Sequence, residues 1–154
     1  METTIIKLAR FATNLDCSEL PESVVEKAKI LVLDSLGCTI GGWFLPPGRI
    51  MLDWIREVGG TGQIRIAGTS VKTSMPWAIY ANSYSSNLLD YDDVHPVAGH
   101  PGCTVVPPSL ALIQGKGCSG KELLTAVVVA YEVGMRIGHA IKPTPERAER
   151  VVGF

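Results

Sequence analysis

Acidic and imidazole side chains gather in one short stretch of the chain, residues 88–101, which reads LLDYDDVHPVAGHP. We call this stretch the Asp/His segment. It holds three carboxylates and two of the chain's three histidines: Asp90, Asp92, Asp93, His95 and His100. A proline follows each of these histidines, and proline disfavours helical backbone at the residue before it. We therefore expect an extended loop that carries both imidazoles.

Clustered aspartates and histidines on a loop allow three interpretations from the residues alone. The first is acid/base chemistry, because imidazole can both give and take a proton near neutral pH. The second is a divalent metal site, although the carboxylates do not alternate as in a calcium loop and no H-x-H or H-x-x-x-H pair occurs. The third is a structural network without chemistry. We assign no residue as a metal ligand.

Apolar stretches that end at glycine or proline predict the helices that must position this segment. They cover residues 3–15, 21–39, 49–58, 76–89, 105–114 and 121–141. Residues 46–48, Pro-Pro-Gly, predict a turn, and residues 63–67 alternate as in a short strand. Ser119 and Glu122 fit a capping box at the start of the last helix. We predict an all-α fold, a single helical domain over residues 1–154 with at most one or two very short strands.

The last predicted helix is long and apolar enough to raise the question of a membrane span. Glu132, Arg136 and His139 lie inside it, and each charge near a bilayer centre costs about 2.5–3.5 kcal/mol on insertion scales. Glu132 and Arg136 are four residues apart, which predicts an ion pair along the helix. These residues favour a buried helix of a soluble domain over a membrane helix.

Composition excludes several classes of partner. The formal net charge is -1 and no run of lysine or arginine occurs, which argues against nucleic-acid binding. The four cysteines form no C-x-x-C pair, and the N-terminus lacks the apolar core of a secretory signal. We therefore predict reduced thiols and a cytoplasmic protein without membrane partners.

Several motifs together resemble the MmgE/PrpD family. They are the run N-L-L-D-Y-D-D-x-H at residues 87–95 with a further asparagine at Asn82, the His100-Pro101 pair, P-x-x-L-A-L at residues 107–112 and D-S-L-G-C-T-I-G-G at residues 34–42. The resemblance covers essentially the whole chain. It implies a mostly helical domain that family members complete with a smaller α/β lid domain. It also implies a small di- or tricarboxylate substrate and chemistry without a metal or organic cofactor.

The resemblance further implies roles for individual residues. His100 would be the catalytic histidine, either as acid/base or by binding a substrate carboxylate, and Asp90 would orient the substrate or its partner imidazole. Asp93, His95 and Asn87 would contact the substrate. Position 94 is valine, where the decarboxylase branch of the family has a hydroxyl residue. The resemblance therefore favours a dehydratase of the 2-methylcitrate dehydratase type over cis-aconitate decarboxylation.

Family members are much longer than this chain, so we expect an N-terminal fragment that carries half a site, lacks the lid domain and is inactive alone. Arg136 or Lys142 would have to supply the cation that a carboxylate substrate needs. A fragment exposes apolar surface that the missing part covers, which predicts a homodimer or larger assembly. Two other functions stay open: a non-enzymatic helical oligomerisation module, and a hydrolase or lyase that binds a metal through the Asp/His segment.

Overall fold

The computed structural model describes residues 2–96 and 98–141. Within these ranges the chain is mostly helical, and the expected all-α fold is confirmed. The elements in chain order are α1 (Thr4–Asn14), a 3-10 turn η1 (Cys17–Glu19), α2 (Glu22–Gly42), α3 (Pro46–Val58), β1 (Ile64–Arg65), β2 (Lys72–Thr73), α4 (Met75–Asn87), α5 (Pro101–Lys116) and α6 (Gly120–Ile141). The two strands pair antiparallel, with Ile64 opposite Thr73.

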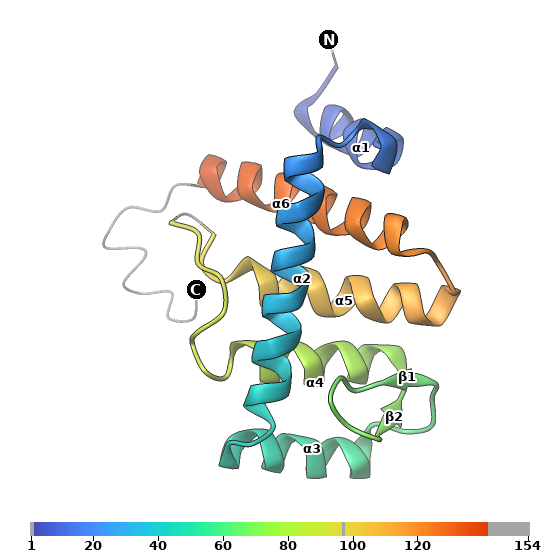
Figure 1. The fold of residues 1–154 in the computed structure, drawn as a ribbon, viewed down its shortest axis with the longest axis vertical. Coiled ribbons are helices and arrows are strands. Elements are labelled where there is room, and N and C mark those ends of the chain that lie inside the picture. The colour runs from blue at the N-terminus through green and yellow to red at the C-terminus, as the bar shows by residue number, and fades with distance from the viewer. Residues whose placement is uncertain (1, 97, 142–154) are drawn as a thin grey trace.

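Helix α2 crosses a stack of four helices, α3 to α6, as Figure 1 shows. The middle of the stack is held by small side chains, which allow backbones to approach closely. Ala78 and Ala81 of α4 are fully buried, and the Ser85 hydroxyl donates to the Thr39 carbonyl of α2 over 2.7 Å. Gly42 of α2 lies so close to the Ser85 carbonyl that a Cβ atom would collide with it. Helices α2 and α4 therefore pack with their backbones close together.

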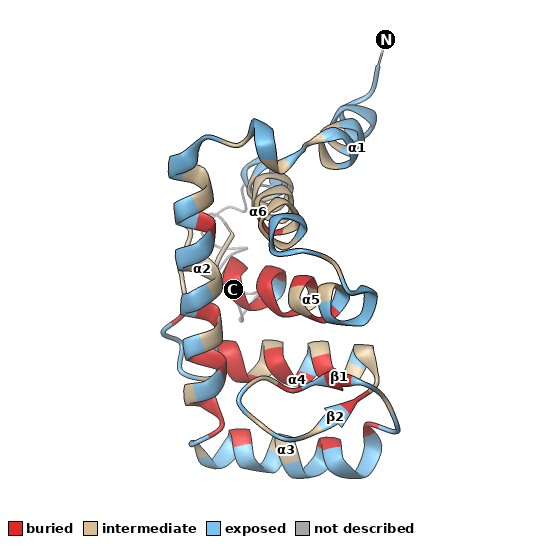
Figure 2. Ribbon diagram, turned by 45° about the vertical axis from the view of Figure 1, so that its right-hand side comes forward, coloured by how far each residue is buried: buried red, intermediate tan, exposed pale blue. Residues whose placement is uncertain are grey.

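The hydrophobic core is divided into three clusters that follow the stack, and Figure 2 shows buried residues on α4, α5 and the inner side of α2. Their buried members are Trp43, Ile55, Ile66 and Ala81 in the first cluster, Ile64, Ala78 and Ala111 in the second, and Ala28, Val105 and Val127 in the third. Since each cluster joins residues from different helices, packing rather than local propensity fixes how the helices lie against one another.

The main differences from the sequence predictions concern α3, β2 and α5. Helix α3 begins at Pro46, so the predicted turn at residues 46–48 is wrong; proline suits the first helical turn because its missing N–H has no helical partner there. The strand β2 was missed. Helix α5 begins at Pro101 instead of residue 105, with Pro107 and Pro108 in its interior. The capping box at Ser119 and Glu122 is confirmed, with the Ser119 N–H donating to Glu122 over 2.7 Å. The prolines expected to end α6 lie outside the described residues.

Helices α2 and α6 are less buried than their sequences suggest. Of the residues in α6, Val127 alone is fully buried, so the prediction of a buried helix is wrong for the described part of the chain. On α2, Ile30 and Leu33 are 57% and 71% exposed. The predicted ion pair of α6 is confirmed, with Arg136 and Glu132 2.8 Å apart. Helix α6 is long and apolar enough to cross a membrane, and so are α2 and α3 if they are taken as one bent span. Core helices of soluble proteins meet the same criteria of length and composition.

Candidate functional site

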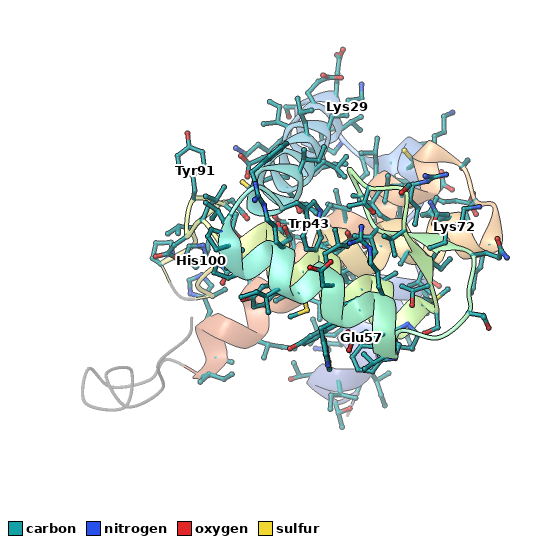
Figure 3. The ribbon with its side chains drawn as sticks, turned by 90° about the horizontal axis from the view of Figure 1, so that it is seen from below. Lys29, Trp43, Glu57, Lys72, Tyr91 and His100 are labelled. Carbon is teal, nitrogen blue, oxygen red and sulfur yellow. The ribbon has the colours of Figure 1, made fainter. Side chains whose placement is uncertain are left out.

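The Asp/His segment lies at one side of the helix stack. It connects the end of α4 to the start of α5, and the C-terminal end of α6 reaches the same side (Figure 1). The rings of His95 and His139 of α6 are 5.6 Å apart in an edge-to-face arrangement. Figure 3 shows His100 at this edge of the molecule, with Tyr91 pointing outward beside it. Three helix ends therefore meet around the segment.

His100 directly precedes α5. It occupies the N-cap position, where its backbone leaves the extended loop before Pro101 starts the helix. Its side chain is only 12% exposed, and both ring nitrogens face a carboxylate. Nε2 lies 3.1 Å from Asp90 Oδ1, and Nδ1 lies 3.0 Å from Asp92 Oδ1. The structure thus brings the two predicted catalytic residues, Asp90 and His100, into direct contact.

Asp92 supports the buried side of the His100 ring. Its side chain is fully buried, and Asn87 at the end of α4 donates a hydrogen bond of 3.1 Å to its Oδ1. The contact between Asp92 and His100 Nδ1 has the distance of an ion pair but not the alignment of a hydrogen bond, and Asp92 Oδ2 accepts no hydrogen bond from the described residues. Asn87 thus contacts Asp92, and the prediction that Asn87 contacts substrate stays a prediction.

Asp90 lies on the outer side of the same ring. Its side chain is 85% exposed, and its φ of 49° makes it a non-glycine residue in the left-handed region. Aspartate tolerates this conformation better than most residues. The left-handed turn follows α4 directly, where the Asp90 N–H donates to the Asn87 carbonyl over 2.9 Å. The carboxylate is thus the solvent-facing partner of His100.

Asp93 has different partners from the other two carboxylates. Its Oδ1 accepts a hydrogen bond of 2.8 Å from the Gly102 N–H of α5, and its Oδ2 accepts one of 2.9 Å from the Tyr131 hydroxyl of α6. Burial, followed by the charge of Asp93, raises the pKa of Tyr131, so this hydroxyl remains a donor. Sequence reasoning missed Tyr131, because one tyrosine on an apolar helix carries no signal of a polar partner.

His95 lies on a tight turn within the segment. Its N–H donates to the Gly99 carbonyl over 2.8 Å, and Gly99 donates back to His95 over 3.0 Å. The prediction that His95 and Asp93 contact substrate is not tested by these contacts and stays a prediction.

Cys103 follows the segment on α5 and is not suited to nucleophilic chemistry. Its thiol donates to the His100 carbonyl over 3.1 Å. Burial, with the nearby charge of Asp92, raises its pKa to about 12, which keeps the thiol protonated at neutral pH. All four cysteines are free thiols. Among residues 2–96 and 98–141, no group of three histidine, cysteine, aspartate or glutamate side chains is arranged to hold a metal ion.

Comparison with known proteins gives a match over nearly the whole chain. The family model of the MmgE/PrpD N-terminal domain covers residues 6–152. The chain belongs to the MmgE/PrpD family.

Curated relatives in this family include cis-aconitate decarboxylases. The enzyme of Aspergillus terreus is 29% identical over 141 residues, which make up 88% of this chain and 29% of the relative. A cis-aconitate decarboxylase-like protein of Aspergillus oryzae is 29% identical over 143 residues, 88% of this chain and 30% of the relative. Human cis-aconitate decarboxylase is 26% identical over 148 residues, 91% of this chain and 31% of the relative. The chain thus spans less than a third of their length. No solved structure matches it.

Proposed function

We propose that this MmgE/PrpD chain supplies the imidazole half of an active site for a lyase that acts on small di- or tricarboxylates without a cofactor. The observation that carries the proposal is His100, held by buried Asp92 on one nitrogen and facing exposed Asp90 on the other. The family and the activity named for its relatives support the substrate class.

The two carboxylates give the two ring nitrogens of His100 different tasks. A neutral imidazole has one N–H and one lone pair, so it can donate to only one of the two carboxylates, whereas an imidazolium donates to both. The charge of fully buried Asp92, 3.0 Å from Nδ1, favours an N–H on this nitrogen by electrostatic attraction, without an aligned hydrogen bond. That leaves Nε2 to take a proton from a substrate carbon or give one to a leaving group. The exposed Asp90 carboxylate can swing away when a substrate arrives.

The described residues provide only part of what such a reaction needs. Removing a proton or CO₂ next to a carboxylate leaves negative charge that requires nearby cations or hydrogen-bond donors. In the described part of the chain, no lysine or arginine forms an ion pair with the Asp/His segment; Arg136 is paired with Glu132 instead. Lys142 lies outside the described residues. We therefore propose that the chain binds a carboxylate weakly and does not turn it over alone.

The finer choice of reaction depends on position 94. The side chain of Val94 is 69% exposed and cannot donate a hydrogen bond, unlike the hydroxyl residue of the decarboxylase branch. This difference favours dehydration of a 2-methylcitrate-like substrate over decarboxylation. The names of the relatives favour cis-aconitate. Binding of cis-aconitate and of 2-methylcitrate should therefore be compared in one experiment.

The test is a titration of the purified chain with cis-aconitate and with 2-methylcitrate, followed by NMR of the three histidine rings, with and without EDTA. We expect millimolar binding of at least one acid that shifts the His100 signals and is insensitive to EDTA. His100→Gln should abolish this binding, while His139→Gln is the matched control. Binding lost on chelation would favour a metal site, and no binding of either acid would favour a non-enzymatic helical module.

A further inference from the structure

We propose that Tyr131 is a positioning residue for His100 and acts through Asp93. The inference rests on the proposed function only in taking His100 as the reacting group. The Tyr131 hydroxyl on α6 and the Gly102 N–H on α5 together fix the Asp93 carboxylate. The fixed carboxylate in turn holds the first turn of α5, on which the His100 ring depends.

Both oxygens of Asp93 are occupied within the protein. Oδ1 accepts from the Gly102 N–H over 2.8 Å and Oδ2 accepts from the Tyr131 hydroxyl over 2.9 Å. Hydrogen bonds to a charged acceptor are stronger than neutral ones. These two bonds fix the orientation of the carboxylate, and each oxygen keeps a further lone pair. We therefore assign Asp93 a positioning role.

The Gly102 contact caps helix α5. The first N–H groups of a helix have no partner within the helix, and a side chain of the N-cap residue usually satisfies one of them. His100 makes no such bond, and Pro101 has no N–H to satisfy. Asp93 replaces the usual cap from nine residues away and places a negative charge at the positive end of the helix dipole.

Glycine at position 102 is required for this cap. A Cβ atom there would collide with Asp93 Oδ1. The carboxylate can therefore approach the helix only because residue 102 has no side chain. Since His100 precedes Pro101 directly, a shift of this first turn also moves the imidazole relative to Asp90 and Asp92.

The Tyr131 hydroxyl can donate its hydrogen bond to Asp93 over a wide range of pH. Burial and the charge of Asp93 raise its pKa, so the hydroxyl does not ionise while an imidazole titrates near neutrality. Its position on α6, 38 residues from Asp93 in sequence, ties the segment to the helix whose His139 also packs against His95. Helix α6 thereby contributes to the geometry of His100 without touching its ring nitrogens.

The test compares Tyr131→Phe with Tyr84→Phe in the ligand-free chain. Each variant removes one hydroxyl from a half-buried tyrosine, and Tyr84 lies on the neighbouring α4. We expect Tyr131→Phe to shift the His100 ring resonances and to speed hydrogen exchange of the Gly102 amide by about tenfold. The reason is that Asp93, which accepts from the Gly102 N–H, then loses the second hydrogen bond that fixes it. Tyr84→Phe should change neither. Equal His100 spectra in the two variants would overturn the proposal even if both lower the melting temperature.

A second variant keeps the proposal testable if Tyr131→Phe folds poorly. Asp93→Asn preserves the shape of the side chain but removes its charge, so it weakens both contacts. We expect it to move the His100 signals in the same direction as Tyr131→Phe and at least as far, because it also weakens the Gly102 contact. The double variant should show no change beyond that of Asp93→Asn, because both substitutions act through one carboxylate. Additive shifts would show independent routes and contradict the proposal. No ligand is added, so failure of carboxylate binding leaves these outcomes unaffected.

Discussion

The imidazole of His100 and the carboxylate of Asp90 meet at the protein surface. His100 Nε2 lies 3.1 Å from Asp90 Oδ1, yet the two side chains are 12% and 85% exposed. The opposite nitrogen faces Asp92, whose side chain is fully buried. One ring thus connects a carboxylate in solvent to one in the interior. We expect the buried carboxylate of Asp92 to contribute to stability and the exposed carboxylate of Asp90 to contribute to ligand binding.

Replacing each of these carboxylates by its amide should separate stability from ligand binding. Asp92→Asn should lower the free energy of unfolding by about 2 kcal/mol, because it leaves a buried imidazole without its charged partner. Asp90→Asn should change stability by less than about 0.5 kcal/mol, because exposed ion pairs contribute little. Urea unfolding at pH 7 measures both. Equal losses of stability would contradict the assignment of the two roles.

The crossing of α2 and α4 should tolerate no side chain at Gly42. A Cβ there collides with the Ser85 carbonyl, so Gly42→Ala should lower the free energy of unfolding by about 2 kcal/mol or more through a shift of the helices. Gly37 on the same helix has no atom within 4 Å of its Cβ position. Gly37→Ala should stabilise the protein by up to about 1 kcal/mol, because alanine favours the helix. Thermal unfolding of the pair tests this, and a destabilising Gly37→Ala would count against the described packing.

The thiols should differ sharply in reactivity. Cys17 and Cys118 are partly exposed, whereas burial raises the pKa of both Cys38 and Cys103, that of Cys103 to about 12. Iodoacetamide at pH 8 should therefore label Cys17 and Cys118 first, since only the thiolate reacts. Mass spectrometry after peptide digestion identifies the labelled sites. Rapid labelling of Cys103 in the folded chain would disprove its burial.

The raised pKa of Cys103 also predicts the direction in which stability depends on pH. In the unfolded chain the thiol ionises near pH 8.5, whereas in the folded chain it stays protonated up to about pH 12. Between these values the unfolded state binds fewer protons, so stability is full below about pH 8.5 and falls as the pH rises. Urea midpoints at pH 8 and pH 10.5 measure the loss. Cys103→Ala should reduce it, and an unchanged slope in this variant would assign the loss to other groups.

Self-association through the outer face of α2 remains a prediction. Ile30 and Leu33 are three residues apart and mostly exposed, and Figure 2 shows much of the outer side of α2 as exposed. We expect the chain to form dimers or larger species at micromolar concentration, and Leu33→Glu to shift them toward monomer. Ser23→Glu adds the same charge to an exposed position on α2 and is the control. Sedimentation velocity of the unmodified chain and the two variants measures their oligomeric state. An unmodified chain that is monomeric at micromolar concentration would refute the predicted self-association.

Local patterns in the sequence were sufficient for most helices and for the centre of the site. The capping box at Ser119 and Glu122 and the ion pair of Glu132 and Arg136 were predicted because each joins residues within one turn of helix. The segment itself was singled out because its carboxylates and histidines cluster within it. The relation between Asp90 and His100 was implied by the family resemblance, and the two side chains are in contact. Such features depend on neighbours in sequence, which a single chain displays directly.

The tertiary structure decided which residues hold the site in place. The start of α5 at Pro101 was missed because Pro107 and Pro108 suggest a later helix, and the cap from Asp93 to Gly102 comes from outside the helix. Tyr131 could not be predicted because its partner is 38 residues away. The sequence by itself determined which groups can do chemistry. Which of these groups contact one another depends on the packing of α5 and α6 against the segment, because hydrogen bonds between distant residues form where helices meet.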